Sequence, residues 1–387
     1  MEQKISEAIC YVGVDDKDID LFEGQYRVPH GISYNSYVIL DEKIAVMDTV
    51  DSRKAGEWLA KLERALGERT PDYLVVQHME PDHAGSVEVL AQRYPQMKLV
   101  GNAKTFPMLK QFFTFDLEER SVLVKEGDAL ELGSHTLHFV MAPMVHWPEV
   151  MVTYESSEKT LFAADAFGKF GSLDTDEEWL PEARRYYLNI VGKYGAQVQS
   201  LLKKAATLEI ARICPLHGPI LSENLGYYIG KYLTWSSYEP EEPGIVVAYA
   251  SIYGHTAKAA QRFAEILREK TEKPVVVYDI ARTDLSLLLA EAFRYDTLVL
   301  AAVSYDGGVF PCAADFLNHL KAKTFRNRRV GLLENGSWVP SAARTMKGLL
   351  EEMKNLTICE PVVTNRSALK EADEKAMGEL AAALLAE

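Results

Sequence analysis

The sequence predicts an α/β protein of two domains, the second of which is a doubly wound parallel sheet. The chain has 387 residues, enough for two or three domains at about 150 residues each. The spacing of apolar segments along the chain changes near residue 240. Residues 235–244 are polar, charged and interrupted by Pro240 and Pro243, a composition typical of an interdomain linker. We therefore expect one domain at residues 1–240 and another at residues 244–387.

The second domain alternates short apolar strands with helices. We expect strands at residues 245–250, 275–279, 297–302, 329–333 and 356–359. A helix is expected after each of them, at residues 257–269, 285–292, 313–323, 342–354 and 369–385. Regular alternation of this kind predicts a parallel sheet covered by helices on both faces.

The first domain is less regular. Two strands at residues 36–40 and 43–48 flank the turn at Asp41 and Glu42, and further strands are expected at residues 73–77, 98–101, 137–142, 151–154, 160–164 and 210–214. Helical patterns lie between them at residues 85–94, 104–113, 194–206 and 222–234. The mixture favours a layered α/β domain whose loops carry the function.

Composition excludes several classes of protein. The formal net charge is −14, which disfavours a nucleic-acid partner because affinity for phosphate depends on Lys and Arg. No apolar run is long enough to span a bilayer, and the first residues lead into no apolar signal segment. Four cysteines stand singly, with no C-x-x-C, which excludes a zinc ribbon, a rubredoxin-type site and a local dithiol: Cys10, Cys214, Cys312 and Cys359. We expect a soluble cytoplasmic protein in a reducing compartment.

The densest chemistry lies at residues 77–86, QHMEPDHAGS, between an expected strand and an expected helix. Four potential metal ligands fall within six positions, and three more follow later beside other strands. Seven such groups are too many for one tetrahedral zinc and suit two metals that share a carboxylate. We expect one metal at His78, Glu80 and His146, the other at Asp82, His83 and His217, and Asp165 as the bridge.

The ligand types indicate which metals fit. Three carboxylates and no thiolate favour iron or manganese over a soft metal. Two divalent ions would keep one uncompensated positive charge, which a bridging hydroxide would cancel. A single histidine is more often a surface or core residue than a ligand, and we interpret the remaining five in that way: His30, His135, His138, His255 and His319.

The H-x-E-x-D-H segment with the distant H, D and H resembles the metallo-β-lactamase fold in its redox form. Hydrolytic members of that fold usually have H-x-H-x-D-H, and Glu80 stands here in place of the second histidine. Together with the flavodoxin-like second domain, essentially the whole chain resembles the flavodiiron proteins, the A-type flavoprotein family. The resemblance implies a metallo-β-lactamase-like αββα sandwich followed by a flavodoxin-like domain, with a non-haem di-iron site in the first and FMN in the second.

Three loops of the second domain are candidates for the flavin site. Flavodoxin-like sheets hold FMN at the carboxyl ends of their strands, with the phosphate at a helix N-terminus. The first loop corresponds to Ser251, Ile252, Tyr253, Gly254, His255 and Thr256, although a turn of this composition alone is usually only a turn. The loops expected to wrap the isoalloxazine ring are Val303, Ser304, Tyr305, Asp306 and Gly307, and Asn335, Gly336, Ser337 and Trp338. Tyr305 or Trp338 could stack on the ring. The sequences of both ring loops differ from those that are commonest in the family.

The resemblance implies a reductase that passes electrons from FMN to the di-iron site. The substrate is dioxygen, reduced by four electrons to water, or nitric oxide, reduced by two electrons to nitrous oxide, or both. Tyr194 lies about where the family places a tyrosine near the substrate. Since the chain has no G-x-G-x-x-G for a nicotinamide nucleotide, the resemblance implies an external donor such as rubredoxin or its reductase. It also implies a head-to-tail homodimer or a dimer of dimers.

Two other classes of function compete with this interpretation. A dinuclear hydrolase of the glyoxalase II or lactamase type would explain the first domain but not the second, and thioester or lactam turnover would identify it. A flavodoxin-like electron carrier or sensor with a degenerate metal half is disfavoured, because no ligand position has been lost. The sequence does not decide between dioxygen and nitric oxide.

Overall fold

The computed structural model describes residues 3–117 and 119–386. The chain divides into two compact units. The first unit comprises Met1–Tyr187 and Tyr194–Leu233, and the second comprises Leu188–Lys193 and Thr234–Glu387. No helix in the described ranges has the length and apolar character needed to cross a membrane.

The first unit contains two sheets. One sheet has the order β1-β2-β7-β8-β9-β10-β11, with strands Gln3–Lys4, Ile9–Tyr11, Tyr37–Ile39, Ala45–Met47, Tyr73–Val75, Lys98–Gly101 and Ser121–Leu123. The other has the order β12-β13-β14-β15-β16, with strands Ala129–Glu131, Thr136–Met141, Met151–Glu155, Thr160–Phe162 and Arg212–Cys214. Two small antiparallel pairs complete the unit, β3 (Val14–Asp16) with β6 (Ile32–Tyr34) and β4 (Leu21–Phe22) with β5 (Tyr26–Arg27).

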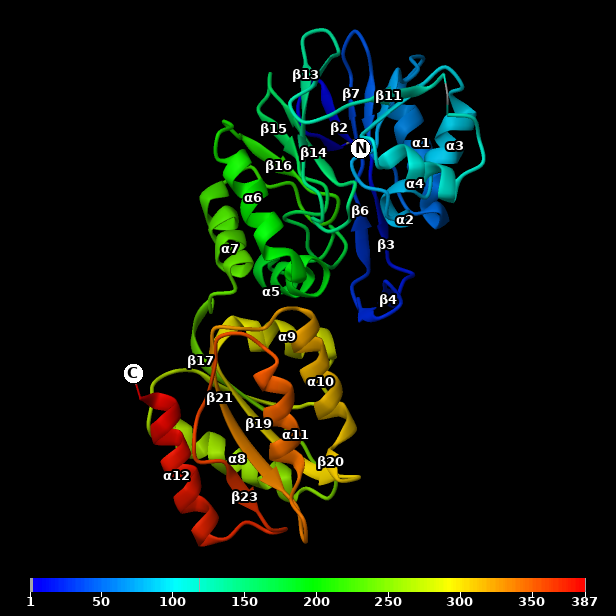
Figure 1. The fold of residues 1–387 in the computed structure, drawn as a ribbon. Helices are drawn as coiled ribbons and strands as arrows, with labels where there is room; N and C mark the ends of the chain where they lie inside the picture. Colours follow the sequence, from blue (N-terminus) through cyan, green and yellow to red (C-terminus); the bar gives the residue numbers. More distant parts are fainter. Residues whose placement is uncertain (1–2, 118, 387) are drawn as a thin grey trace. The chain divides into compact units, whose positions relative to one another are not determined.

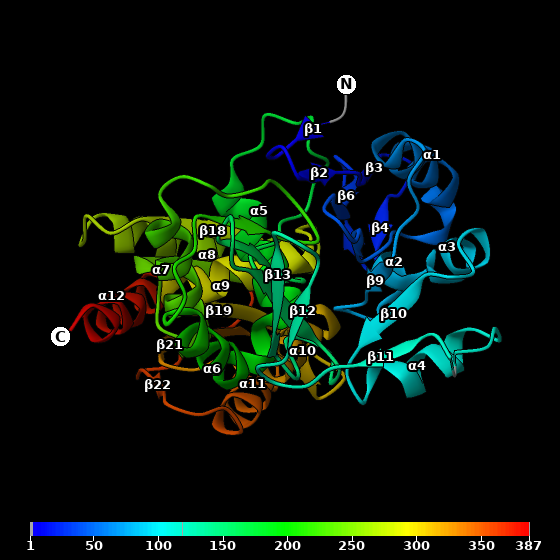
Figure 2. The ribbon, with the colours of Figure 1, turned by 90° about the horizontal axis from the view of Figure 1, so that it is seen from above.

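Helices cover the outer faces of these two sheets. Alongside the first sheet lie α1 (Ala55–Leu66), α2 (Pro81–Ala84), α3 (Val87–Arg93) and α4 (Thr105–Phe112), and Figure 2 shows α1, α3 and α4 gathered near β9, β10 and β11. On the side of the second sheet lie α5 (Trp179–Tyr186), α6 (Gly195–Ala205) and α7 (Leu225–Ser237), the last of which starts in the first unit (Figure 1). The layers are therefore those of an αββα sandwich.

The core of the first unit lies between its two sheets. Side chains from one sheet, among them Ile39, Met47 and Val100, pack against Phe139 and Phe162 from the other, and all are fully buried. Because both inner faces are apolar, the polar side chains collect at the strand ends, where loops leave the sheets. These strand ends position the candidate metal ligands described below.

The second unit is built on a parallel sheet of order β18-β17-β19-β21-β22, with β20 and β23 paired to β19 and β21. The strands are β17 (Glu242–Ala250), β18 (Val275–Asp279), β19 (Tyr295–Tyr305), β20 (Gly308–Val309), β21 (Arg328–Asn335), β22 (Leu356–Ile358) and β23 (Val363–Asn365). The first two strands along the chain lie in swapped order at one edge, which is the flavodoxin-like arrangement.

Helices lie on both faces of this sheet. One face carries α8 (His255–Arg268) and α12 (Glu371–Leu385), which pack together on the buried strands, and the other carries α9 (Leu285–Arg294), α10 (Pro311–Ala322) and α11 (Ala342–Glu351) (Figure 1). Phe263 of α8 and Leu380 of α12 are both fully buried in the shared core. The predicted α/β class, with an αββα sandwich and a doubly wound parallel sheet, is confirmed.

Several elements differ from the sequence-based expectations. The helix expected at residues 85–94 is α3, and a further short helix, α2, precedes it where a loop was expected, so that Asp82 and His83 lie in a helical turn. The linker interpretation of residues 235–244 is wrong at both ends. Helix α7 continues to Ser237, where Trp235 and the following Tyr238 are buried, and β17 already begins at Glu242. Burial of these aromatic rings orders a segment whose prolines and charges suggested a loop.

Candidate metal centre and flavin loops

The loop and helical turn after β9 carry four of the seven candidate ligands. His78 follows the strand closely, Glu80 is the residue before α2, and Pro81 begins that helix, a position that proline tolerates because its missing N–H would have no partner there. Asp48, at the end of β8, accepts hydrogen bonds from the backbone N–H groups of Gln77 (2.7 Å) and His78 (3.3 Å) and from the Gln77 amide (2.8 Å). These bonds fix the start of the segment.

The other three candidates leave the ends of strands in the second sheet. His146 lies in the turn between β13 and β14, Asp165 follows β15 and His217 follows β16. Strands β15 and β16 are parallel neighbours, so their carboxyl ends bring Asp165 and His217 to the same edge. The bond from the Leu216 N–H to the Ala164 carbonyl (2.9 Å) extends this pairing beyond the strands.

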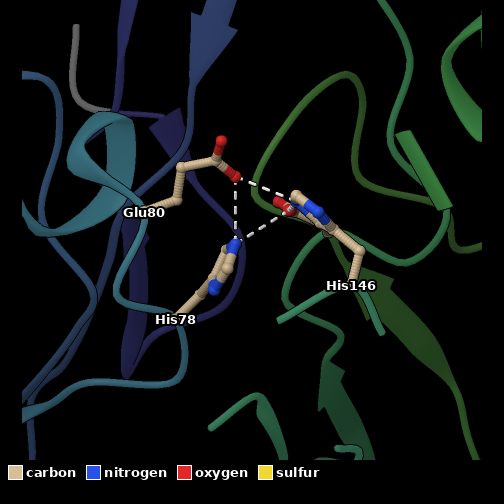
Figure 3. A group of neighbouring side chains, drawn as sticks. His78, Glu80 and His146 are labelled. Carbon is tan, nitrogen blue, oxygen red and sulfur yellow. Dashed lines mark hydrogen bonds and ion pairs between the residues drawn. The ribbon is translucent and has the colours of Figure 1, made fainter. Parts of the chain in front are cut away.

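The structure brings all seven predicted residues together. We call His78, Glu80 and His146 the first group, and Asp82, His83 and His217 the second group. In the first group, Glu80 Oε2 lies 3.1 Å from His78 Nε2 and 2.9 Å from His146 Nε2 (Figure 3). In the second group, Asp82 Oδ2 lies 3.3 Å from His83 Nε2 and 3.2 Å from His217 Nε2.

Asp165 lies between the two groups, with one oxygen toward each. Its Oδ2 is 3.2 Å from His78 Nε2 and 3.1 Å from His146 Nε2. Its Oδ1 is 3.1 Å from His83 Nε2 and 3.8 Å from His217 Nε2. A carboxylate that divides its two oxygens in this way has the geometry of a bridge between two cations.

Burial and charge make this cluster a strong cation site. His78, His83, His217 and Asp165 are at most 1% exposed. Burial disfavours the protonated form of His146, but the neighbouring carboxylates of Asp165 and Glu80 outweigh it and raise its pKa to about 9. Burial opposes ionisation of Glu80 as well, yet bonds to His146 and His78 lower its pKa. The carboxylates of the cluster therefore stay ionised, and they favour a proton or a metal ion on the neighbouring imidazole nitrogens.

The carboxylates also have unused acceptor oxygens. Both oxygens of Asp82 and both of Asp165 are buried and make no hydrogen bond among the described residues, although imidazole nitrogens lie close. Unsatisfied buried carboxylate oxygens are costly unless a cation binds them. Two sets of imidazole and carboxylate atoms, each within 4.8 Å of one another, fit two hard or borderline metal ions such as iron.

One aromatic residue that sequence reasoning missed lies against this cluster. Tyr186, at the end of α5, is fully buried, and its ring centroid is 5.4 Å from that of His217. Burial, followed by the charges of Asp165, Asp82 and Glu80, raises its pKa well above the usual value, and its hydroxyl has no hydrogen-bond partner in the described part of the chain. Tyr194, which the sequence suggested for this place, is half-buried at the end of a 3-10 turn, Gly192–Tyr194. Its catalytic role stays a prediction.

The candidate flavin loops leave the carboxyl ends of β17, β19 and β21, which are neighbours in the second unit. In the first loop, the Gly254 N–H donates to Ser251 Oγ (3.1 Å) and Gly254 has φ +86°, a conformation that favours glycine. His255 starts helix α8, so backbone N–H groups are available at its N-terminus. Tyr253 is 91% exposed and Ile252 39%, whereas Thr256 is buried.

The other two loops show a division between structural and exposed residues. Ser304 Oγ accepts the N–H groups of Ser341 (2.8 Å) and Ala342 (3.2 Å) at the start of α11. Asn335 uses both ends of its amide on the backbone of Ser367. By contrast, Trp338 is 83% exposed and Tyr305 44%. Val303 belongs to β19, Asp306 and Gly307 form the tight turn between β19 and β20, and Gly336 and Ser337 follow β21.

Exposed aromatic rings beside a helix N-terminus fit a planar cofactor that carries a phosphate. Tyr253, Tyr305 and Trp338 come from three loops at one edge of the sheet, and aromatic rings of this kind can stack on a planar ligand. The binding role of the individual loop residues stays a prediction.

Comparison with known proteins covers the whole chain. Residues 32–218 match the family model described as the ODP family beta lactamase. The solved structure of rubredoxin oxygen:oxidoreductase from the anaerobe Desulfovibrio gigas aligns with a TM-score of 0.92 at 25% identity, over 99% of this chain and 98% of that one. A mutant flavo di-iron protein from Thermotoga maritima aligns with a TM-score of 0.86 at 25% identity, over 97% and 95%. The chain is therefore similar to flavodiiron proteins over nearly its whole length.

A curated relative carries a name for its activity. The anaerobic nitric oxide reductase flavorubredoxin of Klebsiella pneumoniae is 28% identical over 90% of this chain and 74% of its own length. The proteins similar to this chain therefore include one named for oxygen and one named for nitric oxide. Both units of the present chain are matched, which leaves neither without a counterpart.

Proposed function

We propose that this flavodiiron protein reduces dioxygen to water, nitric oxide to nitrous oxide, or both, with FMN in the second unit and two iron ions in the first. The observation that carries the proposal is the placement of Asp165, with one oxygen toward each group of ligands. A carboxylate shared in this way would hold two redox-active metal ions close enough to act on one small molecule. FMN would supply electrons to the pair one at a time or two at a time.

The residues of the chain have separate tasks in this proposal. The first group would hold one iron and the second group the other, while Asp165 would link them. Tyr186 would keep its proton, because burial and neighbouring carboxylates raise its pKa, and its hydroxyl would donate a hydrogen bond to a small molecule at the centre. Tyr253, Tyr305 and Trp338 would cover the flavin ring, and the loop before α8 would bind its phosphate.

Names of the relatives suggest the partners. Rubredoxin oxygen:oxidoreductase and flavorubredoxin are both named after rubredoxin, so we propose rubredoxin, or a reductase that normally serves it, as the electron donor. A head-to-tail homodimer, or a dimer of dimers, and a cytoplasmic location are parts of the same proposal.

The decisive experiment begins with the composition of the purified protein. Iron and flavin analysis is expected to give two irons and one FMN per chain, with the visible absorption of a flavoprotein. The anaerobically reduced protein is then mixed separately with dioxygen and with nitric oxide. Rapid reoxidation of the flavin by either gas supports the proposal. Two zinc ions, no flavin and turnover of a thioester or lactam would instead establish the dinuclear hydrolase.

A further inference from the structure

The two ligand groups are closely matched in chemistry. Each contains two imidazoles and one carboxylate of its own, and each faces one oxygen of Asp165. The first group uses Glu80 and the second uses Asp82, and their carboxylate-to-imidazole distances lie between 2.9 and 3.3 Å. The direct ligands alone therefore give little reason for one position to bind a metal more tightly than the other.

The groups differ in what lies behind their imidazoles. His78 Nδ1 lies 2.9 Å from Glu149 Oε1, a carboxylate that is 1% exposed. In the second group, His217 Nδ1 lies 2.6 Å from the neutral backbone carbonyl of Ser33. His83 Nδ1 has no hydrogen-bond partner within the described residues. A buried negative charge therefore supports an imidazole of the first group, and none supports an imidazole of the second through its Nδ1.

Glu149 is held firmly in this place. Its Oε1 also accepts the backbone N–H of Met79 (2.8 Å), and its carbonyl accepts the side-chain amide of Asn102. It lies three residues after His146 in the turn between β13 and β14. Glu149 therefore links the turn that carries His146 to the loop that carries His78. Its side chain thereby helps to fix the positions of two ligands of the first group relative to each other.

The neighbouring buried carboxylate has a different role. Asp48 bonds the backbone of Gln77 and His78 and the amide of Gln77, and contacts no imidazole nitrogen through a hydrogen bond. Among the described residues, Glu149 is thus the buried carboxylate outside the seven that is hydrogen-bonded to a ligand ring. A carboxylate on Nδ1 fixes the tautomer that presents the Nε2 lone pair, orients the ring and raises its basicity.

We propose that Glu149 is a positioning residue for His78 that makes the first group the tighter of two unequal metal positions. This inference rests on the metal centre of the proposed function. It adds the order in which the two positions bind metal, because the first group should bind its ion before the second. Removal of a carboxylate partner from a ligating histidine typically weakens metal affinity by about 10–100-fold.

Metal titration tests the order directly. The metal-free full-length protein is titrated anaerobically with ferrous ions against a competing chelator, and two binding steps of unequal affinity are expected. The Asp82→Ala variant, which damages the second group, should keep the tight step. The His146→Ala variant, which damages the first group, should lose it. Equal steps in the wild-type protein, or the opposite assignment, would overturn the proposal.

Variants of Glu149 test its role. In Glu149→Ala the tight step should weaken by about 10–100-fold while the weak step changes by less than about threefold. Glu149→Gln keeps an acceptor oxygen but removes the charge, so its tight step should weaken less than in the Ala variant. The matched control is Glu155→Gln, since Glu155 is equally buried in β14 and accepts two backbone N–H groups, from Ser157 and Glu158. That control should leave both steps unchanged.

The outcomes separate the two proposals. If the wild-type protein binds no ferrous iron, the proposed metal centre itself fails. If it binds two irons and the Glu149 variants titrate like the wild type, only the role of Glu149 fails. Circular dichroism of the metal-free variants monitors folding, and should the Ala variant unfold, the nearly isosteric Gln variant decides. A loss of affinity that is equal in both steps would also contradict the proposal.

Discussion

The two units of this protein offer contrasting kinds of candidate site. In the first unit, seven charged or polar side chains are brought together at strand ends and almost fully enclosed. In the second unit, the loops at the strand ends expose large rings, with Tyr253 at 91% and Trp338 at 83%. The cluster of the first unit therefore buries carboxylates that carry negative charge, whereas the loops of the second unit expose aromatic rings to solvent.

The contrast follows from what each ligand would replace. A metal ion takes the place of protons and water around buried carboxylates and neutralises charge whose burial would otherwise be costly. A flat organic cofactor instead provides its own apolar surface, and the protein needs only rings to stack on it and N–H groups for its phosphate. A change confined to one of these sites is expected to leave the other intact.

The largest effect is expected from Asp165→Ala. Because Asp165 contacts both groups, its loss should release both metals and lower the rate of dioxygen or nitric oxide reduction by about a thousandfold or more. Iron per chain and stopped-flow reoxidation of the flavin measure these changes, and the FMN content should stay that of the wild type. A variant that retained two irons would show that Asp165 is no bridge.

A smaller effect is expected from Tyr186→Phe, which removes one hydroxyl from the enclosed site. Turnover should fall by about 10–100-fold, the range for a missing proton or hydrogen-bond donor, with the metal content unchanged because Tyr186 is not one of the seven. Tyr194→Phe is the comparison variant. If Tyr194→Phe is the slower of the two, the role belongs to the residue that the sequence suggested.

The open site should respond to Trp338→Ala. Loss of a stacking ring worth about 1 kcal/mol would raise the dissociation constant of FMN about fivefold, without changing iron content. Phe112→Ala, which removes a ring that is 47% exposed at the end of α4 in the first unit, is the matched control. Equilibrium titration of the flavin-free proteins measures both, and an equal change in the two variants would argue against stacking on Trp338.

The smallest effect concerns an imidazole and a carboxylate outside the candidate metal centre. His135 Nδ1 lies 2.7 Å from Asp41, and burial, which would lower its pKa, is outweighed by this bond and by the charges of Glu155 and Glu158, so that the pKa is raised. Burial likewise opposes the charge of Asp41, but the bond to His135 and neighbouring N–H groups lower its pKa. Arg212, which pairs with Glu158 at 2.9 Å, is the other charge of this cluster.

The sign of the pH dependence follows from these two directions. The contribution of His135 is complete below its unfolded pKa of about 6.5 and is lost as pH rises through its folded pKa. That of Asp41 is complete above about 4 and is lost as pH falls through its folded pKa. Chemical denaturation should show His135→Gln less stable than wild type by about 1–3 kcal/mol between these values, with a smaller difference at high pH. A difference independent of pH would contradict the ion pair.

Much of the fold could be predicted because its signals are local. The strands of the second unit are continuous apolar runs, and Ile245, Val246 and Val247 in β17 are fully buried. Helix α1 was not anticipated although Trp58, Leu62 and Leu66 repeat at four-residue intervals on its buried face. In α5 the pattern is obscured, because Arg184 and Arg185 are themselves buried. The ends of α7 and β17 depended on tertiary burial, which no local pattern contains.

The candidate site was predictable only in its direct ligands. The H-x-E-x-D-H segment is recognisable because it places four potential ligands within six positions. Glu149, by contrast, is separated from its partner His78 by 71 positions. Nothing in the local sequence relates the two. Tyr186, Tyr187 and Tyr194 lie in one short stretch, and only the three-dimensional fold determines that Tyr186 is the one whose ring contacts His217.

The choice of ligand atoms has a consequence for durability. All seven candidate ligands would bind through nitrogen or oxygen, so none of them is a thiolate that oxidants or nitrosating species could modify. Cys214, which ends β16 close to His217 in the sequence, is fully enclosed, and burial raises the pKa of its thiol. A protonated, inaccessible thiol reacts slowly. We therefore expect such a centre to react repeatedly with an oxidising gas without oxidation of its own ligands or of this cysteine.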